Sequence, residues 1–441
     1  MRQHKHLDDL MNRAEMDGRC CSASSPAERQ AMLRRTRCGD VVRPFRSVYA
    51  RREYWDGLNP IEQASHVIRE MARRHPERVF AGLSAAVIYG FEHSWTLHDE
   101  PYVYIATDGF TKSRRSYHRL RRISVRRSDI REDCHVVRLY RPRGDGAAQD
   151  GSNTWSQVSK LADRIAHERA LRDDVCIGEV RVTSPARTLV DCALLYPFEH
   201  VLSMFDSALR RGLVTREEIV AVCDGLRVDC GPVFRLLHYA DARSENGGES
   251  FCRAVSIEEG FVPPQLQHTF YSRVTGKEAG RVDFIWHTED GRIIVLEFDG
   301  MQKYIDPEMT SNRDVRQVVR DERQREQDLK EAGVSVVIRT NYNEVVQGAV
   351  HHEADAGRCA ACWGAPNIRA CRLSRKRRCV PKFAPERQVR EHTDANGPVC
   401  VLMCARSSFR RALKDVLGRQ PLPACSPSAQ MGSSWGVSLR Q

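Results

Sequence analysis

Two acidic residues stand within a part of the sequence that is otherwise strongly apolar. Asp283 lies in the segment Arg281–Trp286, and Glu297 lies in the segment Ile293–Gly300. The residues Glu289-Asp290-Gly291 between them suit a three-residue hairpin loop with glycine in the left-handed position. We therefore predict that the two acids lie on neighbouring strands of a β-hairpin.

The hydrophobic pattern sets the register of this hairpin, with Thr288 closing the loop against Arg292. One face is then apolar, with the pairs Phe284–Leu296, Trp286–Ile294 and Val282–Phe298. The other face pairs Asp283 with Glu297 and Arg281 with Asp299. Carboxylates about 5 Å apart repel unless positive charge lies between them, and a divalent metal is the obvious candidate. The alternative is two solvated acids at the ends of strands.

Charged residues near the hairpin add to this pattern. Glu249 falls in the first turn of a helix predicted to end at Gly260. Lys303 follows the second strand, and the range Asp314–Lys330 is expected to form a charged helix closed by Gly333. A strand from Val334 to Ile338, followed by Arg339, is predicted to come next.

This order of elements resembles the PD-(D/E)xK nuclease superfamily and, more narrowly, a domain of unknown function related to very-short-patch-repair endonucleases. The resemblance covers Ser244 to Asn343. It implies a restriction-endonuclease-like core in which Asp283 and Glu297 hold Mg²⁺ or Mn²⁺. It also implies that Glu249 orients a metal-bound water or completes the metal shell. Such a cation keeps several waters, one of which can attack a phosphodiester.

The sequence departs from the superfamily pattern at Asp299. The signature has a lysine at this position, two residues after the second acid, where it would stabilise charge on the phosphate. Lys303, or Arg323 and Arg325 from the next helix, could reach the same space. Alternatively, these basic side chains form a solvated helix face, and the domain has lost its activity.

Three segments of the first half resemble the antitoxin of AbiE-type toxin–antitoxin systems. They are Val41–Ala50, Gly82–Gly90 and Val182–Asp191. The resemblance implies an N-terminal winged helix that binds DNA, with two short helices in Met1–Asp40 and a wing strand in Val41–Ala50. Ser47 stands where that family usually has glycine.

Local signals predict helices in the middle of the chain. Thr183 or Ser184 caps a helix whose first turn carries Pro185. Gly212 separates the two helices that follow, Phe198–Arg211 and Arg216–Cys223. The buried stripe of the first of the three helices is expected to consist of Leu189, Cys192, Ala193 and Leu195.

The net charge of +11 is unevenly distributed along the chain. From His351 onward 16 basic residues face 6 acidic ones, which leaves 53 basic and 52 acidic residues in the first 350. Within that neutral body, Lys112–Arg143 holds 12 basic and 3 acidic residues. This run either contacts a nucleic-acid backbone or forms a solvated basic strand pair. The candidate contacts to nucleic acid are Arg114, Arg115, Arg121 and Arg122, together with Arg323 and Arg325.

Seven of the 16 cysteines lie in the basic C-terminal tail. Cys359 and Cys362 could share a zinc ion with Cys371 and Cys379, but the second pair has the wrong spacing for a zinc ribbon. The tail is rich in Arg, Ser, Pro and Ala and has no strand or helix period, so a disordered tail is favoured over a zinc site.

These observations predict an α/β (α+β) protein of several domains. The predicted ranges are a winged-helix region at 1–50, an antitoxin-like α+β region at 51–240, a nuclease-like domain at 244–345 and the tail at 351–441. Since neither a signal peptide nor a membrane-length apolar run is present, we expect a cytoplasmic protein with free thiols. The predicted function is Mg²⁺-dependent DNA cleavage in bacterial defence or repair. The alternative is a non-catalytic DNA-binding antitoxin or transcriptional autoregulator with a toxin partner.

Overall fold

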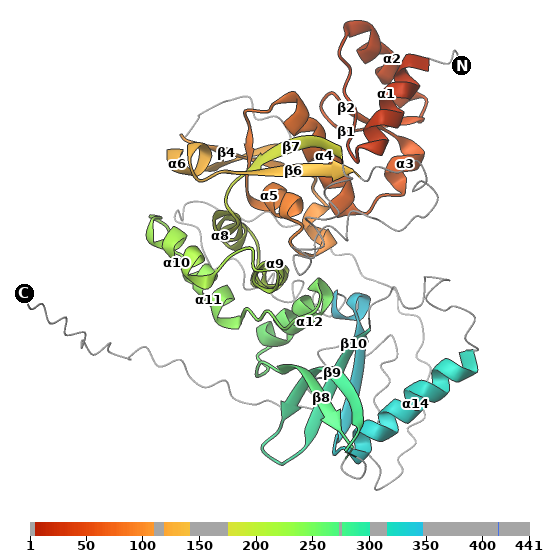
Figure 1. The fold of residues 1–441 in the computed structure, drawn as a ribbon, viewed down its shortest axis with the longest axis vertical. Helices are drawn as coiled ribbons and strands as arrows, with labels where there is room; N and C mark the ends of the chain where they lie inside the picture. Colours follow the sequence, from red (N-terminus) through yellow and green to blue (C-terminus); the bar gives the residue numbers. More distant parts are fainter. Residues whose placement is uncertain are drawn as a thin grey trace, which may run out of the picture. The chain divides into compact units, whose positions relative to one another are not determined.

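A computed structural model of the 441-residue chain has a mixed α/β fold (Figure 1). It describes residues 5–109, 119–141, 175–272, 276–299, 315–346 and 413. The cysteine-containing tail predicted to be disordered, with its four candidate zinc ligands, lies outside the described residues apart from 413. The chain divides into two compact units, Met1–Ala254 and Val255–Gln441. The division falls later than the predicted boundary between residues 240 and 244 and lies inside a helix.

The first unit begins with two helices and a small hairpin. They are α1 (Lys5–Met16), α2 (Pro26–Arg37), β1 (Val41–Phe45) and β2 (Val48–Arg51). Ser25 caps α2 in a capping box with Glu28, which satisfies amide groups at the start of the helix. The segment predicted as one wing strand is an antiparallel pair, β1 with β2. Ser47, in the turn, has a φ of 60°, the left-handed conformation that glycine adopts more readily.

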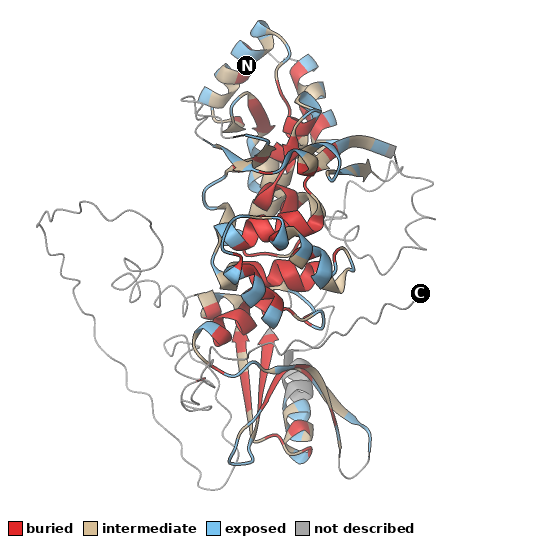
Figure 2. Ribbon diagram, turned by 90° about the vertical axis from the view of Figure 1, so that its left-hand side faces the viewer, coloured by how far each residue is buried: buried red, intermediate tan, exposed pale blue. Residues whose placement is uncertain are grey.

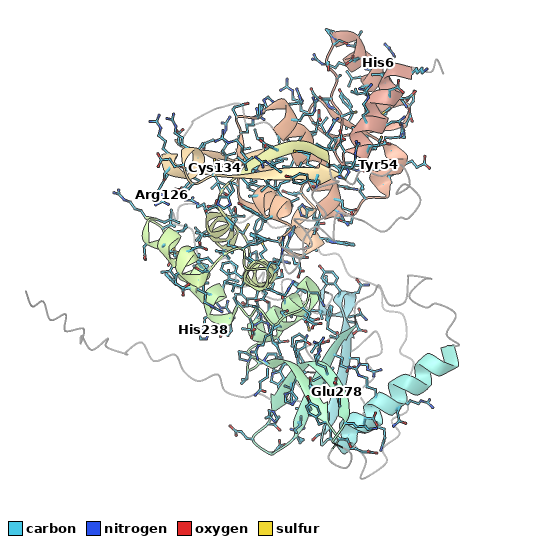
Figure 3. The ribbon with its side chains drawn as sticks, in the orientation of Figure 1. His6, Tyr54, Arg126, Cys134, His238 and Glu278 are labelled. Carbon is cyan, nitrogen blue, oxygen red and sulfur yellow. The ribbon has the colours of Figure 1, made fainter. Side chains whose placement is uncertain are left out.

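A short helix and a longer one connect this hairpin to the rest of the unit. They are α3 (Arg52–Asp56) and α4 (Pro60–Arg74). Tyr54, on α3, is labelled in Figure 3. Its hydroxyl lies 2.8 Å from Nε2 of His66 on α4. Tyr54 also donates to the backbone carbonyl of Glu15 at the end of α1. The end of α1 is therefore linked to α4 through the partly buried contacts of Tyr54.

A five-stranded sheet with the order β5-β4-β3-β7-β6 lies at the centre of the first unit (Figure 1). The strands are β3 (Val79–Phe80), β4 (Val103–Thr107), β5 (Leu120–Ser124), β6 (His135–Arg141) and β7 (Val175–Val182). The 3-10 helix η1 (Trp95–His98) precedes β4, and α6 (Arg127–Arg131) follows β5. The basic run supplies β5 and β6, which occupy opposite edges of the sheet. In the described part of this run, β5 and β6 therefore do not pair with each other, in contrast to the basic strand pair that was one of the two alternatives predicted from the sequence.

Helices pack together into the main hydrophobic core of the first unit. They are α5 (Gly82–Tyr89), α8 (Pro185–Leu195), α9 (Phe198–Arg210), α10 (Arg216–Asp224) and α11 (Gly231–Tyr239). Figure 2 shows buried residues concentrated along these helices. Ser184 caps α8, and Leu189, Cys192 and Ala193 are buried as predicted. The prediction for Leu195 was wrong: it lies at the end of the helix and is 47% exposed.

Helix α12 (Gly247–Glu258) begins in the first unit and ends in the second. The second unit contains a four-stranded sheet with the order β11-β10-β9-β8. Its strands are β8 (Gln265–Tyr271), β9 (Glu278–His287), β10 (Ile293–Asp299) and β11 (Val336–Asn341). β10 is antiparallel to β9 and parallel to β11. A parallel pair needs a crossover, and α14 (Val315–Glu331) lies in the connecting segment.

The predicted hairpin is confirmed where β9 and β10 pair. Phe284 lies opposite Leu296 and Trp286 opposite Ile294. The loop closes between Thr288 and Arg292, and Gly291 has a φ of 82°. The turn chemistry and the apolar pattern thus predicted the register as far as Phe284 and Leu296. The pairs predicted beyond it, Val282–Phe298, Asp283–Glu297 and Arg281–Asp299, are not part of the observed register, because the regular pairing ends at Leu296.

The end of the second unit differs from its predicted form. β11 starts at Val336, two residues later than expected, and continues past Arg339 to Asn341. Residues 342–346 then form a short helix. The side-chain oxygen of Asn341 accepts a hydrogen bond from the Glu344 amide, which caps this helix.

Candidate functional site

Glu297 lies on the face of the sheet that packs against α14. Residues two apart on a strand share a face, so Glu297 lies beside Val295. Ile285 and Val295 pack in one core cluster with Leu329 of α14. Arg325, one helical turn before Leu329, is therefore directed toward Glu297.

Asp283 lies where the two strands separate. The paired register runs from Ile293 to Leu296 on β10 and is not continued at Glu297. One carboxylate oxygen of Asp283 accepts a hydrogen bond of 2.7 Å from the backbone amide of Phe298. The other lies 3.5 Å from the side-chain amide nitrogen of Gln267 on β8. The carboxylate thus contacts both neighbouring strands.

Glu297 is buried between two arginine side chains. Its Oε1 accepts a hydrogen bond of 2.7 Å from Arg325, and its Oε2 lies 3.4 Å from Nε of Arg339. Only 9% of the residue is exposed. Arg339 was not among the residues predicted for this site. The parallel pairing that places Arg339 opposite Glu297 is the missing information, because it joins strands far apart in sequence.

The residues considered as substitutes for the missing lysine lie in different places. Arg325 reaches the acid site, whereas Arg323 is exposed on the same helix. The backbone of Asp299 ends β10 opposite Asn341. Lys303 lies outside the described residues. A cation is therefore present at the second acid, but it comes from α14 rather than from β10.

Glu249 lies in the first turn of α12, as predicted, and takes part in a helix cap. Its amide donates to the side chain of Asn246 over 2.9 Å, and its carboxylate accepts from the Asn246 side-chain nitrogen over 2.6 Å. It also accepts from the backbone amide of Glu245. Glu249 belongs to the first unit, whereas Asp283 and Glu297 belong to the second. Its observed contacts are those of a capping residue.

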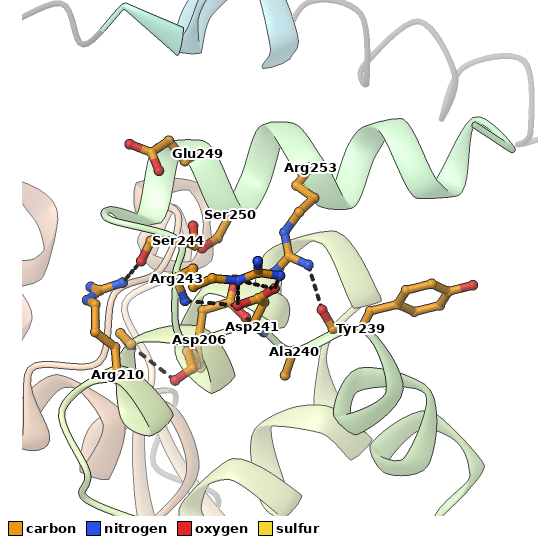
Figure 4. A network of polar contacts seen from close by, with 12 residues as sticks. Asp206, Arg210, Tyr239, Ala240, Asp241, Arg243, Ser244, Glu249, Ser250 and Arg253 are labelled. Atoms are coloured by element: carbon orange, nitrogen blue, oxygen red, sulfur yellow. Dashed lines mark hydrogen bonds and ion pairs between the residues drawn. The ribbon is translucent and has the colours of Figure 1, made fainter. Parts of the chain in front are cut away.

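A buried ion pair that was not predicted fixes α12 to the first unit (Figure 4). Arg253 Nη2 lies 2.5 Å from Oδ2 of Asp206 on α9, and both side chains are almost fully buried. The other Asp206 oxygen accepts from the backbone amide of Asp241. Burial raises the pKa of Asp206, an effect that Arg253 opposes. The second terminal nitrogen of Arg253, Nη1, donates a hydrogen bond to the backbone carbonyl of Tyr239.

The arginines predicted to contact nucleic acid are only partly within the described structure. Arg114 and Arg115 lie outside it. Arg121 and Arg122 are exposed on β5, at an edge of the sheet. The guanidinium of Arg121 lies 4.1 Å from the centre of the Tyr102 ring, a cation–π contact.

The two acids fit a divalent metal in donor type and number. Mg²⁺ takes hard oxygen ligands and is commonly bound through one or two carboxylates with several waters. Asp283 and Glu297 supply such a pair within one hairpin. Among the described residues, no group of three or more His, Cys, Asp or Glu side chains is arranged to hold a metal ion. In this structure the charge of Glu297 is compensated by Arg325 and Arg339 instead.

Comparison with known proteins gives limited similarity. No protein-family model matches the chain. It is 37% identical over 106 residues to the uncharacterized proteins MT2308 and Rv2248 of Mycobacterium tuberculosis, strains CDC 1551 / Oshkosh and ATCC 25618 / H37Rv. The match covers 24% of this chain and 38% of each relative. In the described part of the chain, no helix combines the length and apolar character needed to cross a membrane.

Proposed function

We propose that the second unit is a Mg²⁺- or Mn²⁺-dependent DNA endonuclease in which Asp283 and Glu297 hold the metal. The observation that supports this proposal is that one hairpin carries both acids just beyond its paired residues, with Arg325 from α14 hydrogen-bonded to Glu297. A bound metal would act as a Lewis acid and would lower the pKa of a coordinated water. Cytoplasmic bacterial defence or repair is the proposed setting.

The residues around the acids have defined parts in this proposal. The backbone amide of Phe298 orients the Asp283 carboxylate. Arg325 and Arg339 neutralise Glu297 before a metal binds. Once a cation takes over that role, the two guanidinium groups are available to a phosphate, which arginine binds well. Arg325 would then take the part of the signature lysine, whose position in this sequence is occupied by Asp299.

Cleavage of supercoiled plasmid, branched DNA and mismatched DNA with Mg²⁺ or Mn²⁺ tests the proposal. Wild type is compared with Asp283→Ala and Glu297→Ala. Asp290→Ala is a matched control, because this acid is in the same hairpin but is exposed and paired with Arg292. We expect metal-dependent nicking that both site substitutions abolish and the control retains. No nicking by wild type on any substrate would contradict the proposal.

The second candidate function is that of a non-catalytic DNA-binding regulator or antitoxin with a toxin partner. Two observations favour it: Glu297 is already paired with two arginines, and the chain begins with two helices followed by a two-stranded hairpin. That order of elements is found in winged-helix DNA-binding proteins. Retained DNA binding without any cleavage in the plasmid experiment would support this candidate.

A further inference from the structure

A small basic pocket lies in the first unit, between the N-terminal hairpin and the end of α4. Its volume is about 200 Å³. Pockets for drug-sized ligands have volumes of roughly 300 Å³ or more, so this one suits a smaller group. The lining residues are Phe45, Arg46, Ser47, Met71, Arg74, His75, Arg78 and Leu120.

Three separate parts of the chain bring positive charge to this pocket. Arg46 comes from the turn between β1 and β2, and Arg74 is the last residue of α4. Arg78 comes from the turn that follows, in which its amide donates to the carbonyl of His75. None of the eight lining residues is acidic. The C-terminal end of a helix also carries partial negative charge, which favours cations such as Arg74 there.

The position of these groups is set by contacts of the surrounding backbone. The guanidinium of Arg119, immediately before β5, donates to the carbonyl of Pro44 in β1 over 2.7 Å. This bond connects the hairpin to the edge strand whose first residue, Leu120, lines the pocket. Ser47 holds the turn in its left-handed conformation. The arginines thus project from a framework of a helix end, a turn and a sheet edge.

The electrostatic surroundings of His75 are consistent with a site for an anion. Burial lowers the pKa of His75, and the charges of Arg78 and Arg74 lower it further. Glu77 has the opposite effect, with an oxygen 3.6 Å from Nδ1. An anion bound between the arginines would offset their effect and raise the pKa of this imidazole.

We propose that Arg46, Arg74, His75 and Arg78 form a binding site for one phosphate group, supplied by the backbone of duplex DNA or by a small phosphorylated ligand. A phosphate group fits within the pocket and suits the donor geometry of arginine, which can bind two phosphate oxygens at once. The site is separate from the acid pair of the second unit and does not depend on nuclease activity.

The first arm of the test measures DNA binding by the full chain. Fluorescence anisotropy of a mixed-sequence duplex is recorded over a series of salt concentrations in EDTA, so that no metal-dependent cleavage occurs. Arg74→Ala/Arg78→Ala is compared with wild type and with Arg227→Ala/Arg235→Ala, which removes the same charge elsewhere in the first unit. Loss of one phosphate contact should reduce the slope of log K against log[salt] by about 0.9.

The second arm measures the binding of inorganic phosphate. The pKa of His75 is followed by NMR with and without phosphate, and the signal is assigned with His75→Gln. We expect phosphate to raise this pKa in wild type and not in Arg74→Ala/Arg78→Ala. Arg74→Lys/Arg78→Lys keeps the charge and should retain part of both responses, which separates loss of the site from loss of folding.

The two arms also distinguish the source of the phosphate. A slope reduced only in the pocket variant assigns the phosphate to DNA. An unchanged slope with a phosphate-dependent shift of His75 assigns it to a small ligand. If the pocket variant changes neither the slope nor the response of His75 relative to wild type, the proposal is wrong.

Discussion

Arg325, which contacts Glu297, is a testable substitute for the lysine that the nuclease signature has at position 299. Arg323 and Arg325 lie on the same exposed helix, but only Arg325 is seen to reach the acid site. Arg325→Gln should reduce the rate of metal-dependent cleavage by about 10²-fold, as is usual when a transition-state donor is removed. Arg323→Gln is the control and should leave the rate nearly unchanged. Equal effects of the two substitutions would exclude a specific part for Arg325.

Ser47 provides a prediction that concerns stability alone. A residue with a side chain at a φ of 60° is disfavoured by about 1 kcal/mol relative to glycine. Ser47→Gly should therefore raise the free energy of unfolding of the first unit, by up to about 1 kcal/mol after the greater unfolded-state entropy of glycine is included. Ser47→Ala should give no such gain. Calorimetry of the three proteins measures the difference.

At the scale of elements, helix α12 depends on one buried ion pair. Arg253→Ala would leave the charge of Asp206 buried without compensation, which should cost about 3–5 kcal/mol. Arg243→Ala is a matched control from the same network (Figure 4), because Arg243 itself is largely exposed and its pair with Asp241 should contribute at most about 1 kcal/mol. Urea denaturation of the two variants checks the contrast. Similar losses would mean that α12 is held by apolar packing instead.

Helix α8 carries an acid that should make stability depend on pH. Burial raises the pKa of Asp191 to about 6, although Arg187 opposes the shift. The unfolded value is about 3.9, so between the two pKa values the folded chain keeps a proton that the unfolded chain has lost. Stability should therefore fall as pH rises from about 4 to about 6 and should not change further above that range. Asp191→Asn should remove this dependence, whereas the exposed Asp224→Asn should not.

At the scale of the whole molecule, the sequence predicted features that depend on nearby residues. The hairpin loop, the cap at Ser184, the position of Glu249 in the first turn of a helix and the order of the helices all follow from signals within a few positions. Features made by distant segments were missed. The two basic strands are separated because β3, β4 and β7 lie between them, and Arg339 reaches Glu297 only through parallel pairing.

The division of the chain inside α12 leads to a prediction for truncated proteins. Ala254 of this helix belongs to the core of the first unit, and Phe251 stacks on His200 with ring centres 5.7 Å apart. A fragment ending at residue 260 keeps these contacts and should unfold cooperatively at nearly the temperature of the first unit in the full chain. A fragment ending at residue 243 loses the Arg253 partner of Asp206 and should unfold at a lower temperature. Thermal unfolding of both fragments, followed by circular dichroism, measures the difference between their transition temperatures. Equal transition temperatures would show that α12 adds nothing to the first unit, and that its residues serve the second unit alone.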